Sequence, residues 1–274
     1  MADRRVAVWA AAGFVALLTV YAIAAPLVHP IDEAITDFAA ADQGPGAAHW
    51  FGTDSSGRDL FTLVAKAMRV SLGISAATAV VSTIVGLVVG VAAGAFGGWW
   101  DRIGMRVADA MTAIPSLLLS LLIVSMFHGS VTAIVVSLVL THWTAVARVV
   151  RAELLALRHT EYVEAARLRG LPALRIARIH FLPVAAGQAS VAAVLLVAHA
   201  IWHESTLSFL GAGLPPHQAS LGTLLSEAGE ALLLGQWWRL VFPAGAIVAA
   251  TLALSVLGRS FTAPRIANRT EAVA

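Results

Sequence analysis

Five stretches of the chain contain no aspartate, glutamate, lysine or arginine, and each is long enough to cross a lipid bilayer as a helix. These stretches are Val6–Leu27, Val70–Trp100, Ala110–Ala147, Ile179–His203 and Leu240–Gly258. A helix needs about 20 apolar residues to cross the hydrocarbon core. A soluble protein of 274 residues needs more surface charge than the 12% of charged residues found here. We therefore expect a membrane protein.

The stretch Ala110–Ala147 is long enough for two crossings, and Phe127–Ser130 is the natural break between them. The sequence therefore predicts an all-α integral membrane protein with six transmembrane helices. They are expected near residues 6–28, 71–97, 108–127, 131–149, 183–204 and 238–258. The first stretch follows Arg4 and Arg5, as in a signal peptide, but its apolar run is too long for a typical signal core, so we keep it as a helix.

The basic residues are distributed unevenly between the two sides of this bundle. With both termini in the cytoplasm, fourteen of the eighteen basic residues lie in cytoplasmic segments; the others are Arg58, Lys66, Arg69 and Arg239. Such an excess sets the orientation of membrane proteins, so both termini are expected inside. The pI of about 9.7 follows from this topology and does not indicate nucleic-acid binding. The acids outside, expected to form a solvated face, are Asp32, Glu33, Asp37, Asp42, Glu227 and Glu230.

Small residues predict how the helices pack. Gly86, Gly90 and Gly94 recur every four residues, a stripe that lets helix backbones approach closely in lipid. Pro115 and Pro243 lie inside predicted spans and can bend their helices where neighbouring helices cover the freed carbonyls.

The loop 151–183 between the fourth and fifth helices is the most informative segment. Thr160 is a good helix N-cap, and Glu161 and Glu164 complement the helix dipole in the first turn. Gly170 followed by Pro172 is a strong stop. We therefore expect an isolated helix of about three turns, a sharp turn, and a second helix that runs to Pro183. So short a helix is marginal in water and needs a partner surface.

Within this loop, Glu164-Ala165-Ala166, Gly170 and Leu182-Pro183 resemble the EAA-loop signature of the permease subunits of bacterial ABC importers. His180 stands where the general signature has isoleucine, as is frequent in the peptide-importer branch. The resemblance implies a coupling helix that docks in a cleft of the ATPase subunit. The residues implied in coupling are Glu161, Glu164, Ala165, Ala166, Arg167, Gly170, Leu171, Pro172, Leu182 and Pro183.

Other segments extend the resemblance over about residues 49–262. Gly52–Asp59 looks like the GTDxxGRD motif of dipeptide, oligopeptide and nickel permeases, and Ala95–Asp101, Ile114–Leu119 and Glu204–Gly211 resemble later landmarks of that branch. The chain looks like the C-type subunit, which pairs with a longer B-type permease. The resemblance implies a type I ABC importer permease fold in the bacterial inner membrane, surrounded by lipid.

The same resemblance implies the partners: a B-type permease in a heterodimer, two cytoplasmic ATPase subunits and an extracytoplasmic substrate-binding protein. ATP and Mg are expected on the ATPase subunits, with no cofactor, metal or enzymatic site on this chain. The implied cargo is a di- or oligopeptide, with nickel or another small solute as the alternative. We expect four regions: 1–28, the N-terminal end and first helix; 29–69, the outer loop; 70–262, the permease core; and 263–274, a cytoplasmic tail.

Two near matches to other sites are weaker. Gly52–Asp59 partly matches the phosphate-binding pattern GxxxxGK[ST], but Asp59 would place a negative charge where a hydroxyl should hold magnesium. A capped turn with local pairing of Asp54, Arg58 and Asp59 is the favoured interpretation.

His199 and His203 are spaced i, i+4, as two metal ligands can be, but anchoring at the membrane interface is favoured. His128, His142 and His217 form no ligand spacing with this pair. An autonomous secondary transporter or intramembrane enzyme would need ionisable residues inside the spans, and only Asp109 and Glu204, near helix ends, come close.

Overall fold

The computed structural model describes residues 2–29, 37–127, 130–215 and 218–271, and its side chains from residue 6 to residue 261 within these ranges. In this part of the chain the regular elements are helices, and a single antiparallel bridge joins Thr53 to Asp59. Asp32, Glu33, His128, Gly129 and His217 lie outside the described residues.

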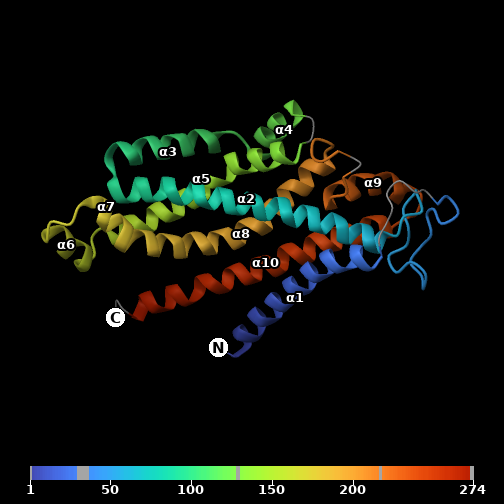
Figure 1. Ribbon diagram of the computed structural model, residues 1–274, viewed down its shortest axis with the longest axis horizontal. Helices are drawn as coiled ribbons and strands as arrows, with labels where there is room; N and C mark the ends of the chain where they lie inside the picture. The colour runs from blue at the N-terminus through green and yellow to red at the C-terminus, as the bar shows by residue number, and fades with distance from the viewer. Residues whose placement is uncertain (1, 30–36, 128–129, 216–217, 272–274) are drawn as a thin grey trace.

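Five helices of the described chain are long and apolar enough to cross a membrane (Figure 1). Four of them are α1 (Ala2–Val28), α2 (Leu60–Phe96), α5 (Val131–Leu157) and α10 (Trp238–Glu271). The fifth runs from Ala173 to Phe209 and consists of α7 (Ala173–Ile176), a π-helical turn (Ala177–Phe181) and α8 (Leu182–Phe209).

The third predicted span is broken. It consists of α3 (Gly98–Ala113) and α4 (Ser116–Met126), which are bent by 83° relative to each other, and counting this pair as one crossing gives six. The expectation of a single helix over 108–127 is therefore wrong. Pro115 has no amide hydrogen to donate, and Ile114 before it is extended, at φ −97° and ψ 133°, as a residue that precedes proline tends to be.

Several helices extend beyond the charge-free stretches. α2 begins at Leu60 and passes through Lys66 and Arg69, and α5 continues to Leu157 through Arg148 and Arg151. The length of a charge-free stretch measures only the part of the helix that lies in the lipid. The ends of the helix itself are set by its capping residues. Asp59 caps α2 by accepting a hydrogen bond from the amide of Thr62.

The centre of the bundle is α2, which packs against α5 and α8, while α1 and α10 pack together on its other side. The glycine stripe lies at the α2–α5 contact, as predicted. A Cβ atom added at Gly86, Gly90 or Gly94 would lie 2.6 to 2.7 Å from the Cβ of a facing residue. Those facing residues are Val146, Val150 and Leu154 of α5.

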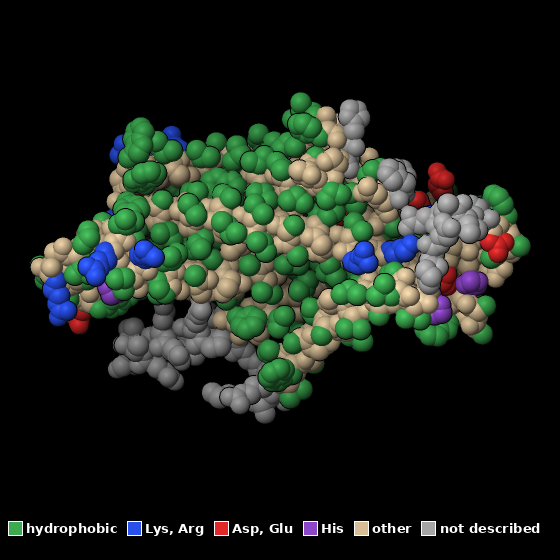
Figure 2. Space-filling model, in the orientation of Figure 1, with side chains coloured by type: hydrophobic (Ala, Val, Ile, Leu, Met, Phe, Trp, Pro, Cys, Tyr) green, Lys and Arg blue, Asp and Glu red, His purple; other side chains and the backbone are tan. Residues whose placement is uncertain are grey.

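The two ends of the bundle differ in their side chains. The α6 end carries α6 (Glu161–Leu168) and α7, and the opposite end carries α9 (Leu221–Leu233) and the loop before α2. Figure 2 shows hydrophobic side chains over the middle of one face, most arginine and lysine side chains at the α6 end with further basic groups toward the α9 end, and acidic side chains mainly at the α9 end. This pattern matches a protein whose waist lies in lipid.

Candidate coupling site

The segment after α5 forms a short helix and a sharp turn, as predicted. α6 spans Glu161–Leu168, eight residues and therefore nearer two turns than three. Thr160 occupies the N-cap position, but its hydroxyl donates to the carbonyl of Leu157 at 2.8 Å and accepts no bond from α6, so the expected side-chain cap is absent. Gly170 adopts φ +77°, the left-handed conformation that glycine supplies at a helix end.

One face of α6 is held by the chain itself. Val163 is fully buried and Ala166 is 7% exposed, and both pack with Leu154, Ile176 and Phe181. The expectation of an isolated helix is thus wrong, because the buried side chains of Val163 and Ala166 hold α6 against α5 and the helix that follows. We call this buried contact the α6 seat. Ala166 belongs to this seat, and Leu171 is partly buried beside it. A seat of this kind stabilises a helix too short to persist alone.

The opposite face of α6 is exposed and combines acidic, basic and apolar side chains. Glu161, Glu164, Ala165, Arg167, Gly170 and Pro172 are all exposed there or in the following turn. Leu168 is 90% exposed and Leu174 is 71% exposed. Exposed apolar residues grouped in one short loop are typical of an interaction surface.

The helix after the turn does not end at Pro183, contrary to the prediction. It continues through the π-helical turn Ala177–Phe181 into α8, and Pro183 lies at the first turn of α8. A proline ring inside an α-helix clashes with the carbonyl four residues earlier, and the wider π turn just before Pro183 relieves that clash. Leu182 and Pro183 are exposed, so they lie on the helix surface away from the α6 seat.

At the opposite end of the bundle, the GTDxxGRD segment forms a tightly bonded loop, as the favoured interpretation predicted. The Asp54 carboxylate is 2% exposed and accepts hydrogen bonds from the amides of Ser56 and Arg58 and from Arg58 Nε, the last at 2.6 Å. Gly52 and Gly57 both adopt φ +77°, and a Cβ atom on either would strike backbone carbonyl oxygens.

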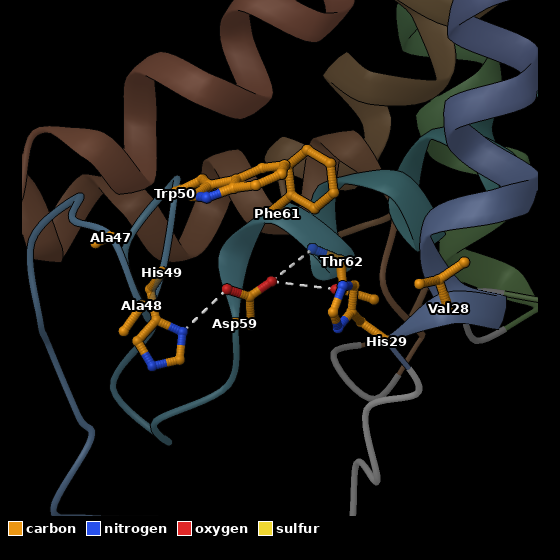
Figure 3. Close-up of a pocket in the computed structure, with 9 residues that line it drawn as sticks. All are labelled: Val28, His29, Ala47, Ala48, His49, Trp50, Asp59, Phe61 and Thr62. Carbon is orange, nitrogen blue, oxygen red and sulfur yellow. Dashed lines mark hydrogen bonds and ion pairs between the residues drawn. The ribbon is translucent and has the colours of Figure 1, made fainter.

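Asp59 also has a structural role in this loop. Figure 3 shows its carboxylate between His49 and Thr62 in a pocket that Trp50 and Phe61 also line. One oxygen lies 3.1 Å from His49 Nδ1, and the other accepts from the amide and hydroxyl of Thr62. These contacts give the carboxylate a structural role as the cap of α2.

A second buried carboxylate joins three helices near the α9 end. Glu204 is fully buried in α8, and it accepts hydrogen bonds from the hydroxyls of Ser71 at 2.7 Å and Ser208 at 2.9 Å. The Ser71 oxygen in turn accepts from the amide of Leu221 at 3.2 Å, at the start of α9. The sequence placed Glu204 near a helix end but did not reveal this network, because its partner Ser71 is 133 positions away in the chain.

A groove opens beside the break at Pro115, between α3, α4, α5 and α8. It is lined by apolar residues together with polar ones: Thr112, Ser116, Thr141, His142, Thr144, Arg148 and His199. Two ion pairs tie α3 to α5 at its side: Asp101 with Arg151, and Asp109 with Arg148 at 3.0 Å. The groove lies along the apolar part of the bundle and holds polar side chains, so it is a candidate wall for a translocation path.

Residues 86–265 match the model of a protein family described as the binding-protein-dependent transport system inner membrane component. The matched segment contains the α6 loop, the glycine stripe at the end of α2, α5, the helix Ala173–Phe209 and most of α10. The chain belongs to this family. Its membership confirms the predicted fold class, the all-α type I ABC importer permease fold, and the predicted likeness to C-type permeases.

Curated relatives cover most of this permease chain. It is 37% identical over 244 residues to the oligopeptide transport system permease protein OppC of Bacillus subtilis (strain 168), covering 89% of the chain and 80% of the relative. It is 36% identical to the dipeptide transport system permease protein DppC of the same strain, covering 88% and 75%. A putative peptide transport system permease protein of Brucella suis biovar 1 (strain 1330) is 39% identical, covering 90% and 83%.

Proposed function

We propose that the chain is the translocation subunit of an ATP-driven importer that moves di- or oligopeptides into the cytoplasm. The names of its relatives support the cargo class, since oligopeptide, dipeptide and peptide transport systems are all among them. The arginines gathered at the α6 end support an orientation in which both termini and α6 face the cytoplasm (Figure 2).

In this proposal α6 is the coupling helix, and its exposed face docks in a cleft of a cytoplasmic ATPase subunit. The observation that carries the proposal is Leu168, 90% exposed on a helix whose other face is fixed by Val163. A helix that is fixed on one face and presents an exposed leucine between acidic and basic side chains on the other is suited to bind in a groove of a partner. ATP and Mg bind to the two ATPase subunits, and this chain holds neither.

The remaining partners complete the importer. A B-type permease forms the other half of the translocation path, and an extracytoplasmic binding protein delivers the peptide. ATP-driven closure of the ATPase subunits displaces α6, and ATP therefore favours one of two packed arrangements of the helices by binding it better.

A matched pair of leucine variants tests the docking surface. Leu168 and Leu233 are 90% and 88% exposed, at opposite ends of the bundle, so neither substitution removes a buried contact. Leu168→Ser should abolish co-purification of the ATPase subunits and peptide uptake, while Leu233→Ser should leave the ATPase subunits bound. Normal ATPase recovery with Leu168→Ser would refute α6 as the docking element.

Charge and turn geometry give a second test. Glu164→Lys combined with Gly170→Val should stop uptake of a labelled dipeptide while the chain still inserts in the membrane, because Gly170 holds φ +77° and Glu164 lies on the exposed face. Uptake at the normal rate in this double variant would count against the coupling role. The cargo class is tested separately by competition of labelled peptide uptake with unlabelled di- and oligopeptides.

A further inference from the structure

Three histidines from two helices meet beside the groove. His142 comes from α5, and His199 and His203 come from successive turns of α8. Each offers a ring nitrogen, and these three atoms lie within 4.8 Å of one another. The ring centroids are 4.6 to 5.2 Å apart. The expectation that His142 stands apart from the pair is therefore wrong, and so is the expectation of interface anchoring, since His203 is only 6% exposed.

From this geometry we infer that His142, His199 and His203 form a binding site for one late first-row divalent metal ion, such as Zn²⁺, on the wall of the groove between α5 and α8. Imidazole nitrogen suits Zn²⁺, Ni²⁺ and Cu²⁺, whereas Ca²⁺ and Mg²⁺ require oxygen ligands. Three histidines with one open position are an established zinc coordination set.

His142 is oriented as a metal ligand. Its Nδ1–H donates to the carbonyl of Leu138, at 2.7 Å within α5. This bond fixes the tautomer and leaves the lone pair of Nε2 free to bind a metal. Histidine ligands almost always donate their other ring nitrogen to a carbonyl, carboxylate or water in this way.

His203 has an unsatisfied buried atom. Its Nδ1 is enclosed and has no hydrogen-bond partner among the described residues. Leaving a buried polar atom unpaired is unfavourable, so such atoms are uncommon in folded proteins. The His203 ring packs against the rings of His142 and His199. In the proposed site this nitrogen is the one that His203 gives to the metal. The neighbouring Glu204 does not compete, because its oxygens are bonded to serine hydroxyls.

His199 supplies the open side of the site. It is exposed and lines the groove, together with the hydroxyl-bearing residues Ser116, Thr141 and Thr144. A fourth ligand, water or a carboxylate, therefore has access from the groove. In a tetrahedral zinc site with Zn–N bonds of about 2.0–2.1 Å, ligand nitrogens lie about 3.4 Å apart. The three nitrogens lie within 4.8 Å of one another, so side-chain rotations that draw the rings together complete the coordination set.

A metal ion bound here would bridge α5 and α8, the two helices on either side of the groove. It would therefore favour the helix arrangement that holds them at this distance, and shift the conformational equilibrium by its difference in affinity for the two arrangements. If the chain is the importer subunit proposed above, bound Zn²⁺ should then slow the import of its cargo.

The test uses the purified full-length chain in lipid nanodiscs, titrated with ZnCl₂ and, for visible spectroscopy, with CoCl₂. We expect one Zn²⁺ per chain and the intense visible absorption of four-coordinate Co²⁺. His199→Gln, at the exposed position, and His142→Gln should each raise the Kd for Zn²⁺ by about 100-fold. Even the loss of a residue that only hydrogen-bonds to a metal ligand can weaken metal binding by up to about that factor. His159→Gln, an exposed histidine outside the cluster, should leave binding unchanged.

Two results would overturn the inference: no saturable Zn²⁺ binding to the wild-type chain, or one equivalent still bound with unchanged affinity by the His142→Gln, His199→Gln double variant. Because His142 is buried, the thermal stability of each metal-free variant is measured as well. If His142→Gln is unstable, the exposed His199→Gln decides the question alone. The experiment measures Zn²⁺ binding and not transport, so its outcome is independent of the proposed peptide cargo.

Discussion

Replacing Gly90 with alanine is the sharpest test of how α2 and α5 are held together. The new Cβ would lie 2.7 Å from Val150 Cβ and 2.8 Å from the carbonyl oxygen of Ala147. Carbon atoms in contact prefer about 3.5–4.0 Å, so the two helices must separate by about 1 Å at this level. Val150 is fully buried and β-branched, and therefore has little freedom to turn away.

The matched control is Gly73→Ala in the same helix. No atom lies within 4 Å of the position of a Cβ at Gly73. Both substitutions gain up to about 1 kcal/mol of helix propensity, so that gain cancels in their comparison. What remains is the overpacking cost at Gly90, about 1–3 kcal/mol.

The free energy of unfolding of both variants is measured by titration with sodium dodecyl sulfate in mixed micelles. Gly73→Ala should match or exceed the wild type, and Gly90→Ala should be less stable than Gly73→Ala by about 1–3 kcal/mol. Equal stability of the two variants would refute the close backbone contact between α2 and α5.

Two further predictions concern polar contacts between helices. Ser71→Ala removes both a donor to Glu204 and the acceptor of a buried amide, so it should lower the free energy of unfolding by about 1–3 kcal/mol, while Ser190→Ala on the exposed side of α8 should change it little. Equal effects of the two alanine variants in the same titration would contradict the buried network. Arg151→Asp places two carboxylates together, and because both side chains are partly solvated it should cost only about 1 kcal/mol. Thermal unfolding should show recovery when Asp101→Arg is added, and an unstable double variant would argue against the pair.

The membrane part of the fold follows from the sequence because bilayer thickness imposes it. Charge-free runs locate the long helices, and the spacing of Gly90 and its neighbours correctly predicts a close helix contact. The GTDxxGRD loop is also local, since Asp54 and Arg58 pair across a single turn. These features depend on residues that are near one another in the chain.

The features that sequence reasoning missed depend on contacts between distant segments. Val163 and Ala166 look like ordinary helix residues until Phe181 and Leu154 are placed against them. His142 and His199 are separated in the sequence by more residues than two long helices contain, so only the packing of α5 on α8 reveals that they meet. A proline in a span signals a bend, but its angle, 83° at Pro115, is set by the packing of both halves.

The unbroken helix from Ala173 to Phe209 determines how far a displacement at the α6 turn can be felt. At 1.5 Å per residue its 37 residues measure about 55 Å, more than the thickness of about 40–45 Å of a membrane with its headgroups. A tilt of about 10° about one end would move the other by about 10 Å over that length. A small movement imposed at the α6 end is thus carried, magnified, to the opposite end of the bundle.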